Sequence, residues 1–173
     1  MSLLQRIFHG PNPRQALEPL YRAVVAAGRH PGWYRNGQVP DTLDGRFDMI
    51  AAILALVLLR LEREGDSARE ESVLLTELFI DDMDATLRQI GIGDYVVGKH
   101  VGRMMSALGG RLTALRDARD SGGFEPAVRR NIFHDSPPCE EALRWVARGM
   151  ERYSRALDAA AADSLLEGRL PPP

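Results

Sequence analysis

Histidines and carboxylates are the first residues to consider, because they hold metals and carry out acid–base catalysis. The four histidines, His9, His30, His100 and His134, are far apart, and none belongs to a His-Glu-x-x-His or Glu-x-x-His motif that places metal ligands on one helical face. Phosphate-binding loops and Gly-x-Ser-x-Gly nucleophile elbows are also missing from the sequence. We therefore expect no metal, no cofactor and no enzymatic activity.

An acidic segment occupies the middle of the chain. Residues 66–90 hold seven acids and two arginines, in a protein whose net charge is only −2. At 100° per residue the charged side chains of this segment share one helical strip, and the apolar ones share the opposite face. The strip consists of Glu77, Asp81, Asp84 and Arg88, and the apolar face of Phe79, Met83, Leu87 and Ile90. An exposed strip has no apolar pocket to raise a carboxyl pKa, so it is either a solvated face or a contact surface for a partner.

Glycines and the single lysine follow the acidic segment. Gly91 and Gly93 are predicted to end its helix, and Asp94 to cap the next one. The next helix carries a row of small residues beside two cations, Lys99 and Arg103. This row, the glycine ridge, consists of Gly98, Gly102, Ser106 and Gly109. It permits close approach of another helix, either inside the bundle or from a partner protein.

Two aromatic residues and a capping motif precede these elements. Residues 30–40 are rich in turn formers and contain Trp33 and Tyr34, which either fill a gap between helices or contact a partner. Asp41 is predicted to cap the following helix, and Asp44 to interact with the amides of its first turn.

The hydrophobic periodicity predicts an all-α protein. Asn12 and Pro13 are typical of a helix start, and Met49 to Leu59 is apolar without a break. Because a membrane span needs about 20 such residues, this run is instead typical of a helix in the middle of a bundle. A polar turn is predicted over 62–71 and a short helix over 125–134, and a last helix carries Leu143, Val146, Met150, Tyr153 and Leu157. With one cysteine and no strand-like alternation, residues 1–173 are predicted to form a single-domain helical bundle of about seven helices.

Several of these motifs resemble the ubiquinol–cytochrome c chaperone family. The resemblance is carried by Leu20-Tyr21, Trp33-Tyr34, Val39-Pro40-Asp41-Thr42-Leu43-Asp44-Gly45-Arg46-Phe47-Asp48-Met49, Leu78-Phe79-x-Asp81-Asp82-Met83-Asp84, Gly91-Ile92-Gly93-Asp94 and Val97-Gly98-Lys99. It spans about residues 17–115, and further helices are predicted beyond it over 124–168.

The resemblance implies a non-enzymatic assembly factor. Such a factor binds cytochrome b or its nascent chain and assists assembly of the ubiquinol–cytochrome c reductase complex, together with a second assembly factor. The expected contact residues are Trp33, Tyr34, Asp41, Asp44, Arg46, Asp81, Asp82, Asp84, Arg88, Asp94, Gly98, Lys99, Gly102 and Arg103. We expect no nucleic-acid partner, because the net charge is negative, and membrane association only through the client.

The sequence also suggests a cellular location and leaves two alternative functions. No transit peptide is evident, which favours a bacterial-type cytoplasmic protein that is peripheral at the inner membrane. Two alternatives remain open. A small helical enzyme would need a pocket with convergent polar groups, and a permanent structural subunit of a membrane-associated complex would expose a large apolar patch.

Overall fold

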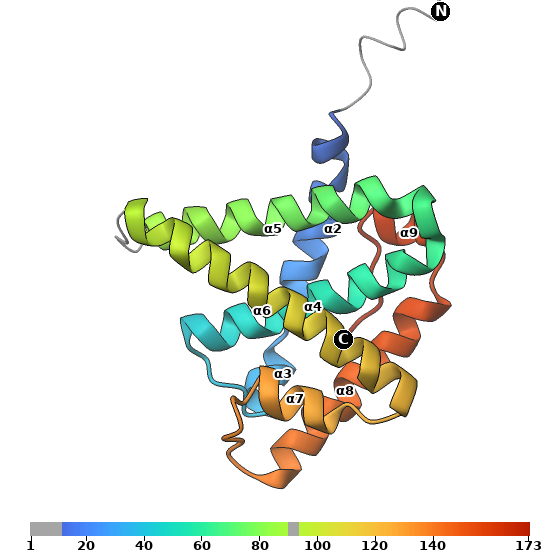
Figure 1. Ribbon diagram of the computed structural model, residues 1–173. Helices are drawn as coiled ribbons and strands as arrows, with labels where there is room; N and C mark the ends of the chain where they lie inside the picture. The colour runs from blue at the N-terminus through green and yellow to red at the C-terminus, as the bar shows by residue number, and fades with distance from the viewer. Residues whose placement is uncertain (1–11, 90–93) are drawn as a thin grey trace, which may run out of the picture.

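A computed structural model describes residues 12–89 and 94–173, and gives the backbone alone for residues 94–97 and 99–101. About 80% of the protein is helical, and the described residues contain no strand. The helices are α2 (Pro13–Gly28), α3 (Pro31–Arg35), α4 (Leu43–Leu61), the 3₁₀ helix η1 (Glu62–Ala68), α5 (Arg69–Gln89), α6 (Asp94–Ser121), α7 (Glu125–Asn131), α8 (Glu140–Ala159) and α9 (Ala162–Leu166). The predicted all-α class is therefore confirmed (Figure 1).

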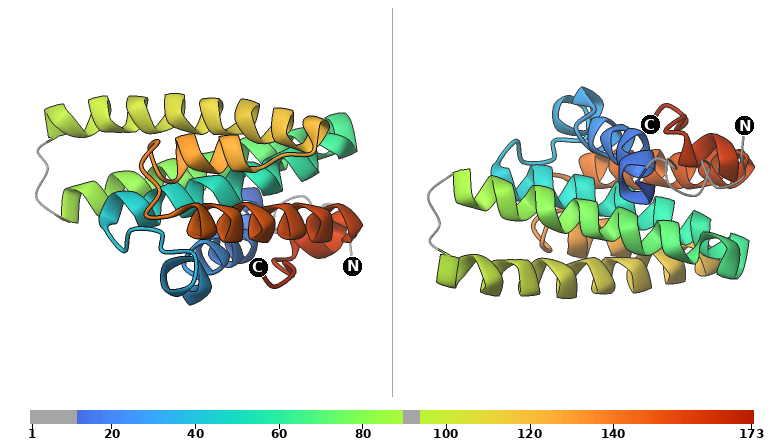
Figure 2. Two further views of the ribbon diagram at one scale, coloured as in Figure 1. Left: turned by 90° about the horizontal axis from the view of Figure 1, so that it is seen from below. Right: turned by 90° about the horizontal axis from the view of Figure 1, so that it is seen from above.

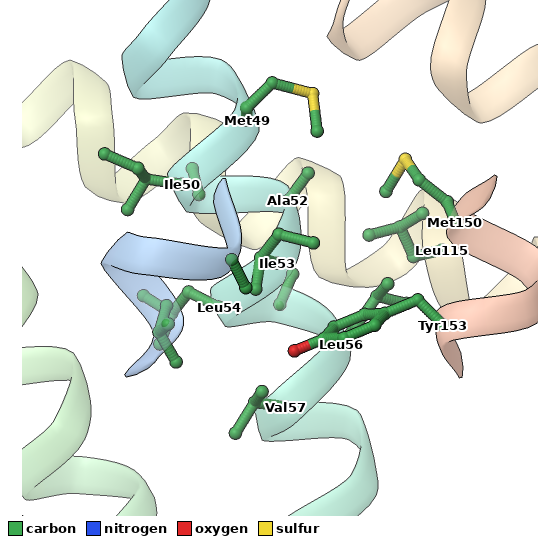
Figure 3. Packing of buried hydrophobic residues seen from close by; sticks show 14 of the residues in the cluster. Met49, Ile50, Ala52, Ile53, Leu54, Leu56, Val57, Leu115, Met150 and Tyr153 are labelled. Atoms are coloured by element: carbon green, nitrogen blue, oxygen red, sulfur yellow. The ribbon is translucent and has the colours of Figure 1, made fainter. Parts of the chain in front are cut away.

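Helix α4 forms the centre of the bundle. Every residue from Asp48 to Leu61 is buried, and α4 packs against α2, α6 and α8. Figure 3 shows Ile53 and other α4 side chains close to Leu115 of α6 and to Met150 and Tyr153 of α8. The unbroken apolar run thus produces a helix that is covered on all sides, as predicted. None of the described helices combines the length and apolar character that crossing a bilayer requires.

The remaining helices lie around α4 on two sides. Figure 2 shows α6 along one edge of the molecule and α8 and α9 toward the opposite edge. Helix α5 packs against both α2 and α6. Its apolar face is buried as predicted through Phe79, Met83 and Leu87, joined by Leu75. Ile90, predicted to belong to this face, and Gly91 and Gly93, predicted to end the helix, lie outside the described residues.

Helix starts follow local capping chemistry, with one correction. The Asn12 side chain accepts a hydrogen bond from the Arg14 amide at 3.1 Å, as expected for a cap followed by Pro13. At α4 the cap is Thr42 and not Asp41, because the Thr42 hydroxyl accepts from the Gly45 amide at 3.1 Å. Asp41 is instead paired with Arg46, whose Nε lies 2.6 Å from its carboxylate.

Two predicted boundaries shift for identifiable reasons. The polar turn expected over 62–71 is shorter: Gly65 takes a φ of +64°, which reverses the chain, and α5 already begins at Arg69. The short helix expected over 125–134 ends at Asn131. Beyond it, His134 and Asp135 adopt left-handed φ values of 48° and 61°, and the Asp135 amide donates to the Arg129 carbonyl at 3.0 Å.

Candidate docking site between helices α5 and α6

A groove lies between α5 and α6 where they meet the end of α4. Its volume is about 350 Å³, and it is lined by Leu58, Glu62, Arg69, Ser72, Val73, Thr76, Glu77 and Leu112. Val73 is an apolar residue that lies off the buried face of α5, and its side chain is 54% exposed. The groove therefore presents apolar side chains to solvent between two carboxylates, Glu62 and Glu77.

The glycine ridge follows the groove along α6 and faces solvent. Gly98, Gly102, Ser106 and Gly109 are exposed, and a Cβ atom built on any of these three glycines would meet no heavy atom within 4 Å. Met105, on the same helix, is 36% exposed. The small residues are therefore not used for packing inside the bundle, and the surface remains open to another chain. The sequence allowed the ridge either to pack inside the bundle or to contact a partner protein. Its described members do not pack inside the bundle.

The cations beside the ridge are only partly described. Arg103 is exposed and makes no hydrogen bond or ion pair within the described part of the chain. Asp94 starts α6, but its side chain and that of Lys99 lie outside the described residues.

The acidic strip on α5 is largely engaged by other side chains. Arg14 of α2 forms an ion pair with Asp81. The Tyr21 hydroxyl, also on α2, donates at 2.6 Å to Asp82, the predicted contact residue next to the strip. Arg88 Nε donates to Asp84 at 2.7 Å within α5. Most of the strip therefore ties α5 to α2 or to itself, and only Glu77 of the strip also lines the groove.

The packing of α2 and α3 also changes the pKa values of two tyrosines. Burial raises the pKa of Tyr21 well above its ordinary value, and the neighbouring Asp82 carboxylate raises that pKa further. The pKa of Tyr34 is also raised, chiefly by burial. Both hydroxyls therefore act as neutral donors in the fold.

Residues near α3 form a second cluster. Tyr34, Asp41 and Arg46 line a pocket of about 380 Å³ together with Arg29, Pro31 and Arg35. The Tyr34 hydroxyl donates to the Gly28 carbonyl at 2.9 Å, and the hydrogen bond from Arg46 lowers the pKa of Asp41. Asp44 is exposed in the first turn of α4. Trp33, in contrast, is 2% exposed, and its indole N–H donates to the Ala27 carbonyl at 2.9 Å, so it fills a gap between helices.

Neither the groove nor a buried ion pair was predicted from the sequence. Val73 is an apolar residue off the buried stripe of α5, which is the signal that could have identified the groove. Arg111 lies on the core face of α6 between Leu108 and Leu115, and forms an ion pair with Asp48. A single charge within an apolar stripe is the corresponding signal for a buried polar contact.

The comparisons with known proteins agree with this architecture. Residues 35–171 match the family model described as ubiquinol-cytochrome C chaperone. The crystal structure of the Cbp3 homolog from Brucella abortus is similar, with a TM-score of 0.83 and 26% sequence identity, over 98% of this chain and 95% of that chain. No curated protein matches the sequence. Because the family model covers most of the chain, the protein belongs to the ubiquinol–cytochrome c chaperone family.

Proposed function

We propose that this chaperone binds cytochrome b during assembly of the ubiquinol–cytochrome c reductase complex, and that the client docks on the α5–α6 groove and the glycine ridge. The observation that carries the proposal is the exposed apolar groove of about 350 Å³, which lies beside the solvent-facing glycine ridge of α6. Family membership supplies the chaperone role.

The chemistry of this surface suits a membrane-protein client. A client of this kind consists of apolar helices, which associate closely wherever glycine lets two backbones approach. Val73, Leu112 and Leu58 offer an apolar contact in the groove. Cytoplasmic ends of transmembrane helices carry an excess of Lys and Arg, which would meet Glu62 and Glu77 at its edge. Glu62 already holds Arg116 at 2.8 Å, so Glu77 is the carboxylate available to a client cation.

The test exploits two exposed apolar residues on different surfaces. Val73 and Leu43 are 54% and 49% exposed, and only Val73 lines the groove. In cells that produce the reductase complex, tagged Val73→Gln should capture roughly fivefold less cytochrome b than the wild type, the loss expected for an interface residue worth more than 1 kcal/mol. The matched variant Leu43→Gln should capture a normal amount. Equal capture by both variants would place the client elsewhere, and recovery of no cytochrome b by the wild type would refute the proposed client.

A further inference from the structure

Helix α8 presents an arginine row opposite its buried face. Its inner face contributes Leu143, Val146, Met150, Tyr153 and Leu157 to the core. On the outer face, Arg144, Arg148 and Arg152 follow one another at four-residue spacing, and all three are exposed. Side chains four residues apart lie one above the other on a helix, so the three guanidinium groups project from one strip.

These arginines differ from most others because they have no partner. Elsewhere in the described chain, Arg116, Arg119 and Arg129 are held by carboxylates at 2.8 Å. Arg144, Arg148 and Arg152 make neither a hydrogen bond nor an ion pair with any described residue. The row is therefore a set of cations that the fold itself does not use.

Helix α3 extends this surface with more cations and aromatic rings. Trp33 contacts Trp145 of α8 edge-on, with ring centroids 5.8 Å apart and an interplanar angle of 81°. Arg29, just before α3, and Arg35, its last residue, are exposed and have no ionic partner among the described residues. Both line the pocket of about 380 Å³. Figure 1 shows α3 and the first half of α8 at the same lower end of the molecule.

Few carboxylates oppose this charge. Asp41, Glu140 and Glu151 are engaged by Arg46, Arg129 and Arg155, respectively. Two nearby acids, Glu141 and Asp44, are exposed and make no ion pair within the described chain. We name as the arginine face the five unpaired cations Arg29, Arg35, Arg144, Arg148 and Arg152.

We propose that the arginine face docks directly on an anionic phospholipid bilayer. Unpaired arginines complement anionic headgroups, and the pocket beside Arg29 and Arg35 is large enough to admit a phosphate group. Tyr34 and Trp145 are partly buried at the same surface, and amphipathic rings of this kind favour the boundary between headgroups and acyl chains. Membrane contact would then come from the chaperone's own surface, and not only through its client.

The aromatic geometry favours lipid over nucleic acid. Proteins that bind single-stranded RNA stack bases on the faces of exposed aromatic rings. Trp33 is buried, and Trp145 is half-buried with its ring packed against Trp33. The arginine face thus supplies charge without an open stacking platform.

The experiment measures sedimentation of the purified protein with lipid vesicles, in the absence of any client. The protein should sediment with vesicles that contain phosphatidylglycerol and remain in solution with vesicles of phosphatidylcholine alone, and added salt should release it. Because each arginine near an anionic surface contributes about 1 kcal/mol, the double variant Arg144→Gln, Arg148→Gln should lower the partition coefficient about 30-fold. The charge-preserving pair Arg144→Lys, Arg148→Lys should retain binding.

A matched variant removes the same charge from other surfaces. Arg63 and Arg130 are exposed and lie on η1 and α7, outside the arginine face. Arg63 is held by Asp158 at 2.9 Å, and Arg119 holds the same carboxylate at 2.8 Å, so Asp158 keeps a partner in the variant. The variant Arg63→Gln, Arg130→Gln should therefore sediment as the wild type does. Equal losses in the two glutamine pairs would overturn the proposal, since they would indicate a response to net charge alone. If the wild-type protein does not sediment with anionic vesicles but binds single-stranded RNA, the membrane proposal is wrong and the arginine face is a nucleic-acid-binding surface. Client capture is a separate measurement, so this test succeeds or fails independently of the proposed function.

Discussion

Arg111 is the residue that connects three helices through buried polar contacts. Its guanidinium forms an ion pair with Asp48, donates to the Asn131 carbonyl at 3.2 Å, and lies 5.5 Å from the centre of the Phe47 ring. Asp48 and Arg111 are only 4% and 3% exposed. His134 adds a contact from outside, with Nε2 2.8 Å from the second Asp48 oxygen.

Removal of one partner should therefore be costly. Arg111→Met leaves the Asp48 carboxylate buried without its cation, and we expect the free energy of unfolding to fall by about 3–5 kcal/mol. The double variant Asp48→Leu, Arg111→Met should recover most of that loss, because an apolar pair carries no desolvation penalty. Urea unfolding curves measure both values. A small effect of Arg111→Met would show that the pair contributes little to stability.

Two buried tyrosines should respond oppositely to loss of the hydroxyl. The Tyr153 hydroxyl is buried and has no hydrogen-bond partner among the described residues, so Tyr153→Phe should raise the free energy of unfolding by about 1 kcal/mol. Tyr21→Phe removes the hydrogen bond to Asp82 and should lower it by about 1 kcal/mol. Thermal unfolding followed by circular dichroism compares the variants, and a destabilised Tyr153→Phe would contradict the assignment.

At the scale of the helix, glycines of α6 and α8 have opposite roles. A Cβ atom at Gly102 meets no heavy atom within 4 Å, whereas a Cβ atom at Gly149 would lie 2.7 Å from the Trp33 ring. Gly102→Leu should therefore keep or raise stability by up to about 1 kcal/mol through helix propensity, and should reduce capture of the client. Gly149→Leu should destabilise the bundle by roughly 1–3 kcal/mol through overpacking.

Paired measurements of stability and capture separate these roles. If Gly102→Leu unfolds the protein, the ridge packs against the chain itself. If Gly102→Leu leaves both stability and client capture unchanged, the ridge is an exposed surface without a docking role.

For the whole molecule, alkaline pH should be a selective probe of the fold. Burial raises the pKa values of Tyr21, Tyr34 and Tyr153, so the folded state disfavours their ionisation. The unfolded chain ionises tyrosine near pH 10, so the free energy of unfolding should be steady below about pH 9 and fall as pH rises above 10. Lys99 is the single lysine, and arginine does not titrate in this range, so few other groups obscure the effect.

Urea titrations at several pH values measure this dependence. The variant Tyr21→Phe should show a shallower decrease above pH 10 than the wild type, because one of the three shifted groups is gone. A free energy of unfolding that stays constant up to pH 11 would show that these hydroxyls ionise as readily in the folded protein as in the unfolded chain.

Local chemistry explains most of what could be predicted of the fold. Three predicted features depend only on residues close together in the sequence, and each is present in the structure. They are the apolar run Met49–Leu59, the helix start at Asn12–Pro13, and the buried stripe through Phe79, Met83 and Leu87. A local pattern does not decide between two adjacent residues that can both cap the same helix. Asp41 and Thr42 are both good capping residues, and the choice depends on Arg46, which draws the Asp41 carboxylate away from the helix start.

The sequence by itself determined the helical class, the central helix, the absence of a disulfide and the resemblance to a chaperone family, because these depend on composition, periodicity and local motifs. Only the tertiary structure decided which polar residues remain available. Asp81 and Asp82 are both among the predicted contact residues, but α2 lies against them and supplies Arg14 and Tyr21 as partners. Gly102 was open to either role, and it faces solvent because the core face of α6 is occupied by Leu108 and Leu115. Such outcomes depend on which helices become neighbours, and no single segment of the chain contains that information.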